Sequence, residues 1–467
     1  MASNQPLAAV VLAAGKGTRM RSNRAKVLHE AAGRPLAFFP VSRALEAGAA
    51  PVVVVVGHQA DAVEAALGAV LPGAPLRFAR QAEQLGTAHA VLSARATLEG
   101  HRGRVLILSG DTPLLTTATV QAVLSGLDGG AKLSMGTMRL PDPRGYGRIV
   151  RDAAGRAQRV VEEKDASDAE RAIDEVNTGL YAVDAGFLWT SLGRIGSSNA
   201  QREYYLTDLV AMAAAAGGAA TVEVPAEDAS GVNDREELAR AGRRLVRRMA
   251  SALMKAGVTI EDPDRFDCHV DVSVGADTVI EPNVRLLEGT KVGGGCRVGA
   301  GTILYRTEVA DGATLLPYTV ARESVIGPAA KIGPFSHLRP GSDAGPEVEL
   351  GAFVETKKAK LGRKTKAHHL SYLGDAELGA GVNVGAGTIT CNYDGAAKHL
   401  TKIGDGAFVG SDSILVAPIE IGAGAYVAAG STLTDPVPPG ALALGRARQV
   451  VKDGWVEAHA PKKAPKK

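Results

Sequence analysis

The stretch "VGADTVIEPNVRLLEGTKVGGGCRVGAGTIL" (Val274–Leu304) carries an aliphatic residue at every sixth position. An α-helix repeats every 3.6 residues and a half-buried strand every two, so neither uses this period. A triangular parallel β-helix does, because one hexapeptide forms each side, its aliphatic residue points inward and small residues turn the corners. The stretch therefore predicts a parallel β-helix. The residues in phase are Val274, Ile280, Leu286, Val292, Val298 and Leu304.

The same period recurs along the rest of the chain. It resumes at Ile326, Ile332 and Leu338, and again at Ile403, Val409, Leu415, Ile421, Val427 and Leu433. Two segments interrupt it, "PGSDAGPEVE" (Pro340–Glu349) and "TCNYDGAAKHLTK" (Thr390–Lys402). We expect both to loop out of the solenoid, where functional sites are commonly built.

Upstream of about residue 233, short apolar runs alternate with alanine-rich helical stretches. "PVVVVVG" (Pro51–Gly57) and "RVLILSGD" (Arg104–Asp111) are continuous aliphatic runs, typical of strands covered on both faces. We expect a parallel or mixed sheet between helices, with ligands at the carboxyl ends of its strands. The Gly15–Gly17 turn and Asp111 lie at such ends.

Asn233 or Asp234 is a plausible cap for a helix that runs to about Lys255. Its basic, amphipathic pattern indicates a solvated connecting helix, with a membrane-surface helix as the alternative. The final "HAPKKAPKK" lacks apolar residues and is expected to be a disordered tail. The predicted domains are residues 1–233, a linker helix 234–257, a β-helix 258–445 and a C-terminal segment 446–467.

Composition narrows the class of protein. The chain has 467 residues, of which 45% are hydrophobic and 22% charged, with a net charge of +3. These values indicate a globular multi-domain protein and give no electrostatic argument for nucleic-acid binding.

The early apolar run has no basic leader or cleavage site, and no segment is long enough to cross a bilayer. Three scattered cysteines are typical of free thiols in a reducing cytoplasm.

The turn "LAAGKGTRM" (Leu12–Met20) fits neither the dinucleotide fingerprint nor the P-loop. Its backbone N–H groups, with Lys16, Arg19 and nearby Lys26, could still form an anion nest. Asp111 at the end of a neighbouring strand could bring Mg²⁺ to a nucleoside triphosphate. The amides and glycine of "QAEQLGTAHA" (Gln81–Ala90) could read the edge of a base. An ordinary strand-to-helix turn, a helix cap and turn chemistry are the alternatives at these three places.

Taken in order, several motifs resemble those of the sugar-1-phosphate nucleotidyltransferases. They are "LAAGKGTRM", "RAKVLHEAAGRPL", "QAEQLGTAHA", "GDTPL", "GYGRI", "VEEKDA", "NTGLY", "YYLTD" and "GVNDR". Joined to a β-helix, they resemble the bacterial bifunctional N-acetylglucosamine-1-phosphate uridylyltransferase/glucosamine-1-phosphate N-acetyltransferases. The resemblance runs from about Leu7 to Trp455. It implies a Rossmann-like mixed sheet with helices on both faces, a linker helix and a left-handed β-helix.

The resemblance also implies two reactions. Acetyl-CoA would acetylate glucosamine-1-phosphate, and UTP would then transfer uridylyl to N-acetylglucosamine-1-phosphate, releasing pyrophosphate. The product is a precursor of peptidoglycan and lipopolysaccharide. A cytoplasmic homotrimer that requires Mg²⁺, with acetyltransferase sites between subunits and no stable membrane insertion, is likewise implied.

Residues of the first site follow by motif. Asp111 and Asn233 would hold Mg²⁺, while Arg19 and Lys26 would neutralise phosphates. The remaining substrate contacts implied are Leu12, Ala13, Ala14, Gly15, Gln81, Gly86 and Thr87 around the nucleotide, and Gly147, Glu162 and Asn177 around the sugar.

Residues of the second site follow in the same way. His369 is the implied base, because an ammonium cannot attack a thioester before it loses a proton. The family usually has a small residue where His368 stands, so this chain departs there. The implied ligands of the amino sugar phosphate are Arg339, Lys357, Tyr372, Asn383, Asn392, Tyr393 and Lys398. Lys398 is expected to reach the substrate or CoA, in its own subunit or in a neighbouring one. Those of acetyl-CoA are Ala386, Ser411, Ala429 and Arg446.

Two rival functions remain at this point. One is a nucleotidyltransferase for another base or sugar whose β-helix serves only assembly and regulation. The other is a non-enzymatic binding factor, which would be expected to lose the metal ligands and loop cations that this chain keeps. The loops "HHLSYLGD" and "CNYDG" argue against the first rival, since a purely structural solenoid needs neither.

Overall fold

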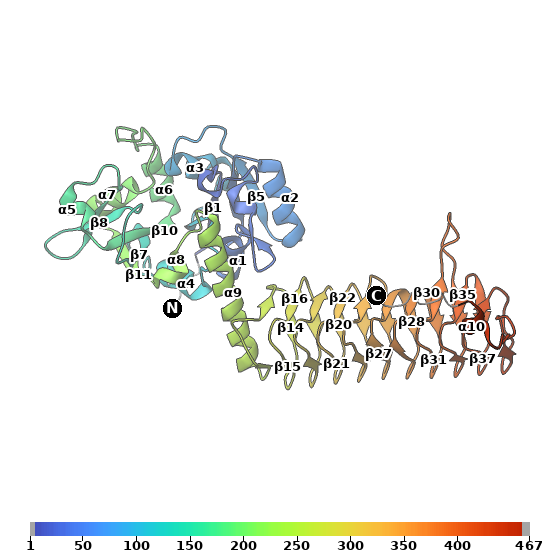
Figure 1. Cartoon of the computed structure of the whole chain (residues 1–467). Helices are drawn as coiled ribbons and strands as arrows, with labels where there is room; N and C mark the ends of the chain where they lie inside the picture. Colours follow the sequence, from blue (N-terminus) through green and yellow to red (C-terminus); the bar gives the residue numbers. More distant parts are fainter. Residues whose placement is uncertain (1–4, 460–467) are drawn as a thin grey trace, which may run out of the picture. The chain divides into compact units, whose positions relative to one another are not determined.

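A computed structural model describes residues 5–459. The chain divides into two compact units, Met1–Met249 and Ala250–Lys467, and the division falls inside helix α9 (Arg235–Lys255) (Figure 1). Each unit is built from one of the two sequence patterns. The predicted linker helix at 234–257 corresponds to α9.

Unit 1 contains a mixed sheet. Strands β1 (Leu7–Ala13), β4 (Val52–Val56), β5 (Leu76–Arg80) and β6 (Arg104–Ser109) are parallel, with β1 between β4 and β6. Strand β10 (Glu175–Asp184) runs antiparallel to β6 and to β7 (Leu133–Arg139), and β11 (Ala219–Glu223) closes that edge. A hairpin of β8 (Arg148–Arg151) and β9 (Ala157–Val161) pairs with β10. The two apolar runs predicted as buried strands are β4 and β6.

Helices cover both faces of this sheet (Figure 1). Helices α1 (Phe38–Glu46), α2 (Ala60–Val70) and α4 (Thr117–Ser125) pack with one face of β1 through Ala9 and Val11. Helices α3 (Thr87–Ser93), α6 (Ala185–Leu192) and α7 (Asp208–Ala215) pack with the other face through Ala8 and Val10. Alternate residues of one strand therefore enter two separate cores, which explains its unbroken apolar sequence.

Helix α9 begins after Asp234, whose Oδ1 accepts the backbone N–H of Glu237 at 2.9 Å. It is not solvated all round, because Ala241, Leu245 and Val246 are buried and Arg248 donates to the carboxylate of Asp228 at 2.7 Å. Among residues 5–459, no helix is both long enough and apolar enough to span a membrane.

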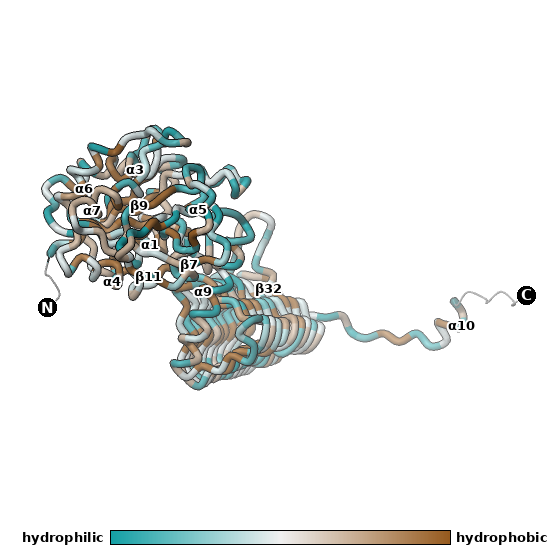
Figure 2. The backbone as a smooth tube through the Cα atoms, turned by 90° about the vertical axis from the view of Figure 1, so that its left-hand side faces the viewer, coloured by the Kyte–Doolittle hydropathy of each residue, from teal (hydrophilic) through white to brown (hydrophobic). Residues whose placement is uncertain are grey.

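Unit 2 is a left-handed parallel β-helix whose coils superimpose when it is viewed along its length (Figure 2). Its short strands form an 11-stranded sheet on one side and a 17-stranded sheet over the other two. Paired residues such as Val279 and Arg297 are 18 positions apart, as three hexapeptides require. The coil that pairs Lys291 with Glu308 is one residue shorter, and this accounts for the breaks in phase after Leu304.

Hydroxyl side chains fill the corners of the coils. Thr278 Oγ1 donates to the Gly293 carbonyl and Ser336 Oγ to the Gly351 carbonyl, both at 2.7 Å. The sequence predicts small residues at these corners but not their role. The buried hydroxyls satisfy backbone carbonyls that the tight turn removes from water.

The prediction that Pro340–Glu349 loops out is wrong. Strand β26 (Asp343–Ala344) pairs with the coils on either side, and Ala344 is buried at an inward position midway between Leu338 and Leu350. The six-residue period is unbroken here, and alanine simply takes the aliphatic place.

The second interruption does project (Figure 1). The chain leaves β32 (Ile389–Cys391) and returns at β33 (Thr401–Ile403), and a bridge between Tyr393 and Lys398 closes the loop on itself. After the last coil, residues 446–459 are exposed and end in helix α10 (Trp455–His459). Most of the predicted disordered tail, residues 460–467, lies outside the described residues.

Candidate active sites

The first candidate site begins at the glycine turn after β1. Gly17 has a φ of 62°, and a Cβ atom on it would lie 2.5 Å from Cβ of Lys26. Only glycine therefore allows the turn to pack directly against Lys26. The Lys26 ammonium reaches from there to form an ion pair with Asp111.

Asp111 and Asn233 come from distant parts of the chain but lie on adjacent backbones. The N–H of Val232 donates to the Asp111 carbonyl at 2.8 Å. Arg19 donates to Asn233 Oδ1 at 3.0 Å, so each predicted metal ligand already faces a cation. One carboxylate and one amide oxygen fit Mg²⁺, which commonly takes few protein ligands and completes its shell with substrate phosphates and water. Within residues 5–459, no cluster of three or more His, Cys, Asp or Glu side chains offers a richer metal site.

A cavity of about 270 Å³ opens beside this pair. It is lined by most of the predicted nucleotide contacts, namely Leu12, Ala14, Gly15, Lys26, Gln81, Gly86, Thr87 and Asp111. Gly86 has a φ of 110°, and a Cβ there would lie 2.6 Å from the Tyr204 carbonyl oxygen. Ala13 is buried in the sheet, and Arg19 and Asn233 lie outside the cavity lining.

Five lining residues were not predicted, namely Val27, Gln84, Ala90, Ser109 and Glu203. Gln84 Nε2 donates to the Ala14 carbonyl at 2.6 Å and so fixes the glycine turn to the Gln81–Gly86 loop. Glu203 comes from the segment before α7 and also lines the cavity. Gln84 stands in the same amide-rich motif as Gln81, which is the signal that could have identified it, whereas nothing local marks Glu203.

The predicted sugar contacts gather around β10. The N–H of Asn177 donates to the Gly147 carbonyl at 2.9 Å. Glu162 lines a separate cavity of about 410 Å³, where the Thr207 hydroxyl donates to it at 3.0 Å. Burial raises the pKa of the Glu162 carboxyl, and the charges of Asp165 and Asp208 act in the same direction.

The second candidate site is organised by strand register. Strand β29 (Lys366–His369) pairs with β31 (Asn383–Val384), then β34 (Phe408–Val409) and β37 (Tyr426–Val427). Continued two residues further, this register aligns His369 with Ala386, Ser411 and Ala429. Arg446 donates a hydrogen bond to the Ala429 carbonyl at 2.7 Å. The fourth predicted acetyl-CoA residue therefore joins the row that begins at His369, and we call this row the His369 corner.

The two neighbouring histidines differ in their surroundings. His368 Nε2 lies 3.0 Å from Glu349 Oε2, whereas the exposed His369 imidazole has no hydrogen-bond partner among residues 5–459. A free, accessible ring nitrogen can accept a proton from a substrate. The geometry therefore favours His369 over His368 as the base.

Three cations meet on the adjacent side of the coils. Register aligns Arg339 with Lys357, and the Lys398 ammonium of the same chain is close enough to act on the charge of Lys357. The neighbouring Lys398 and Arg339 charges hold the pKa of Lys357 below its usual range. Glu355 pairs with Arg339 at 2.7 Å and raises the pKa of that guanidinium. Positive charge concentrated in this way suits a phosphate.

Three of the four remaining predicted sugar ligands, Tyr372, Asn392 and Tyr393, lie near these cations. A Cβ on Gly374 would strike the Tyr372 ring, so the glycine lets Tyr372 fold across the coil. Asn392 donates to Asp375, and Tyr393 at the base of the loop is 59% exposed. Asn383 lies on the other sheet, paired with Lys366.

A nucleotide-sized cavity with paired cations, followed by a hexapeptide β-helix with a free histidine, defines a nucleotidyltransferase joined to an acyltransferase. A family model of MobA-like NTP transferase domains matches residues 9–164. Models of the bacterial transferase hexapeptide and of the succinyl-transferase hexapeptide repeat match residues 400–435 and 271–306.

Relatives extend this similarity over nearly the whole chain. The bifunctional protein GlmU of Anaeromyxobacter sp. (strain Fw109-5) is 71% identical, covering 97% of this chain and 93% of its own. GlmU of Trichlorobacter lovleyi is 52% identical over 96% and 97%, and that of Sorangium cellulosum 51% over 96% of each. The chain belongs to the GlmU family of bifunctional enzymes, which act as acetyltransferase and uridylyltransferase in UDP-N-acetylglucosamine synthesis.

Proposed function

We propose that unit 1 transfers uridylyl from UTP to N-acetylglucosamine-1-phosphate through the residues around Asp111. The ion pair between Lys26 and Asp111 at the nucleotide cavity carries this proposal. Asp111 and Asn233 hold Mg²⁺, which supplies charge neutralisation at the phosphates when bound. Arg19 and Lys26 then pair with phosphate oxygens in place of their present partners.

The main task of the enzyme in this reaction is to align the two substrates. The phosphate of the sugar attacks the α-phosphorus of UTP and pyrophosphate leaves, so two anions must approach each other. Gln81, Gly86 and Thr87 hold the nucleoside, while Gly147, Glu162 and Asn177 hold the acetylated sugar. Fixed cations offset the repulsion, and no nucleophilic side chain is needed.

In unit 2, we propose that His369 takes a proton from the amine of glucosamine-1-phosphate. The amine nitrogen then attacks the thioester carbonyl of acetyl-CoA, and CoA leaves as the thiolate and is protonated. Arg339, Lys357 and Lys398 bind the substrate phosphate, and Tyr372, Asn383, Asn392 and Tyr393 orient the sugar. Ala386, Ser411, Ala429 and Arg446 line the path of acetyl-CoA beside His369.

A homotrimer is proposed from the exposed apolar ladder on the coils. The rings of Tyr318, Phe335 and Phe353 stack on one another although they are 57%, 47% and 60% exposed. Leu370, directly after His369, continues the ladder at 64% exposure. Such a surface beside the candidate base suits cover by a second copy.

We propose that this work takes place in the cytoplasm, because the three scattered cysteines of the chain suit a reducing compartment. Its product would supply the synthesis of peptidoglycan and lipopolysaccharide. Chelation separates the two halves of the proposal. EDTA should abolish pyrophosphate release while CoA release continues, and Asn233→Ala should raise the Mg²⁺ concentration for half-maximal activity by about tenfold. Pyrophosphate release that survives chelation, or an unchanged Mg²⁺ requirement in Asn233→Ala, would show that Asp111 and Asn233 do not hold a required metal ion.

A further inference from the structure

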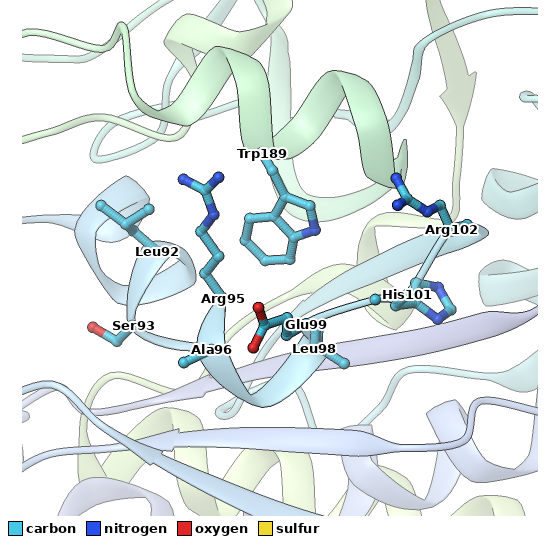
Figure 3. Close-up of a pocket in the computed structure, with 10 residues that line it drawn as sticks. Leu92, Ser93, Arg95, Ala96, Leu98, Glu99, His101, Arg102 and Trp189 are labelled. Atoms are coloured by element: carbon cyan, nitrogen blue, oxygen red, sulfur yellow. The ribbon is translucent and has the colours of Figure 1, made fainter.

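Unit 1 contains a second hollow, of about 560 Å³, that the two reactions do not use. Leu92, Arg95, Leu98, Glu99, Arg102 and Trp189 form most of its wall (Figure 3). It shares no lining residue with the nucleotide cavity. Helix α3 connects the two places, since Thr87 at its start lines the cavity and Leu92 near its end lines the hollow.

Two free arginines give the hollow its charge. The exposed Arg95 and Arg102 guanidinium groups make no hydrogen bond or ion pair with other residues of the described range 5–459. The nearby Arg104, in contrast, is paired with Asp128 at 2.6 Å. Among the described residues, Glu99 is the only carboxylate that lines the hollow. A free guanidinium presents a planar set of donors that suits phosphate oxygens.

An aromatic surface stands between these cations. Figure 3 shows the Arg95 side chain extending beside the Trp189 indole, with Arg102 beyond the other side of the ring. Trp189 belongs to α6 and is only partly buried, so the hollow offers part of its indole to a ligand. Leu92 and Leu98 add apolar surface. A flat ring can stack on the indole while its charged groups reach the arginines.

We propose that this hollow binds a nucleoside diphosphate, with its base against Trp189 and its phosphates on Arg95 and Arg102. The volume is in the range of small-molecule sites. The shared chemistry is a planar base that carries a diphosphate. The enzyme handles two sources of it, the uridine diphosphate part of its product and the adenosine diphosphate part of CoA.

The chain has two tryptophans, Trp189 and Trp455, which makes a direct test available. In full-length Trp455→Phe protein, fluorescence reports on Trp189 alone. We expect UDP and ADP to change it saturably, with the tighter of the two identifying the source, and pyrophosphate and uridine to bind at least tenfold more weakly. Arg95→Ala and Arg102→Ala should each weaken nucleotide binding by about tenfold, the value of one charged hydrogen bond.

Arg156→Ala, which removes an exposed arginine from the β8–β9 turn, is the matched control and should bind normally. Continued pyrophosphate release would show that the Arg95→Ala/Arg102→Ala double variant is folded. A fluorescence response that persists in that folded double variant, or no response to either nucleotide, would overturn the proposal. Pyrophosphate that binds as tightly as UDP and ADP would exclude a role for Trp189.

Discussion

At the residue scale, the two candidate sites use charge in the same way, because each concentrates cations where we propose that a phosphate binds. The sequence pattern of the turn indicates that position 17 needs glycine. The structure gives the reason, because a side chain there would collide with Lys26. The pairing of His368 with Glu349 could not be predicted, since it joins residues 19 positions apart across one coil. Register across coils, rather than local sequence, decides which of two adjacent histidines is free.

The cluster of Arg339, Lys357 and Lys398 makes a pH-dependent prediction. Since neighbouring positive charge lowers the pKa of Lys357, this ammonium loses its charge at a lower pH than an isolated lysine as the pH rises. Lys398→Met removes one phosphate contact but allows the Lys357 pKa to rise. We expect its KM for glucosamine-1-phosphate to increase by about tenfold at neutral pH.

The alkaline limb of kcat/KM for the acetyl transfer should also move to higher pH in Lys398→Met. Lys402→Met, which changes a lysine just outside the loop, is the matched control and should leave the profile in place. If the alkaline limb stays at the same pH in Lys398→Met, the charge of Lys398 does not control the pKa of Lys357.

The histidine pair makes a second prediction. His369→Ala should lower CoA release by about 10²- to 10⁴-fold, as loss of a general base does. His368→Ala should stay within about threefold of the parent, because its ring is occupied by Glu349. Thiol release measured with acetyl-CoA and glucosamine-1-phosphate distinguishes them, and the reverse order of losses would make His368 the base.

At the element scale, the β-helix was predictable from its inward residues, while its loops were only half predictable. The period identified the coils, and the Thr390–Lys402 interruption does project. Pro340–Glu349 was misjudged because proline, glycine and charge are read as loop signals, yet the inward position needs only a small apolar side chain such as Ala344. In unit 1, the apolar runs of the sequence predicted the strands. Gly147, Asn177 and Glu162 come together around β10 because of the β8–β9 hairpin, and no local sequence pattern predicts where that hairpin lies.

That hairpin supplies a prediction through Arg148, which is 1% exposed at the start of β8. It pairs with Glu163 at 2.6 Å and donates to the Tyr146 carbonyl, so it fixes the segments that carry Gly147 and Glu162. Arg148→Met should lower the free energy of unfolding of unit 1, because it removes the ion pair with Glu163 and leaves the Tyr146 carbonyl without its donor. It should also raise the KM for N-acetylglucosamine-1-phosphate more than the KM for UTP.

Urea unfolding followed by Trp189 fluorescence in Trp455→Phe protein measures the first effect, and initial rates of pyrophosphate release measure the second. Arg171→Met, whose side chain is on the surface, serves as the control. Equal changes in both KM values would mean that Arg148 supports the unit as a whole and not the sugar contacts.

At the scale of the whole molecule, two units with separate cores carry separate chemistry in one chain. The apolar ladder of Tyr318, Phe335 and Phe353 is one apolar surface of unit 2 that a single chain leaves uncovered. Phe335→Asp should dissociate the proposed homotrimer and reduce acetyl transfer while uridylyl transfer persists, because the ladder lies next to the His369 corner. Sedimentation velocity with both activity assays checks this, and a variant that stays trimeric would place the subunit contact elsewhere.

We propose that Asp111 and His369 serve two independent active sites, and that the N-acetylglucosamine-1-phosphate made at the second is used at the first. The most direct test mixes Asp111→Ala and His369→Ala proteins with glucosamine-1-phosphate, acetyl-CoA, UTP and Mg²⁺, and measures UDP-N-acetylglucosamine. Each variant alone should make almost none, and the mixture should restore synthesis, since one variant acetylates and the other uridylylates. A mixture of folded variants that remains inactive would show that Asp111 and His369 do not serve independent sites.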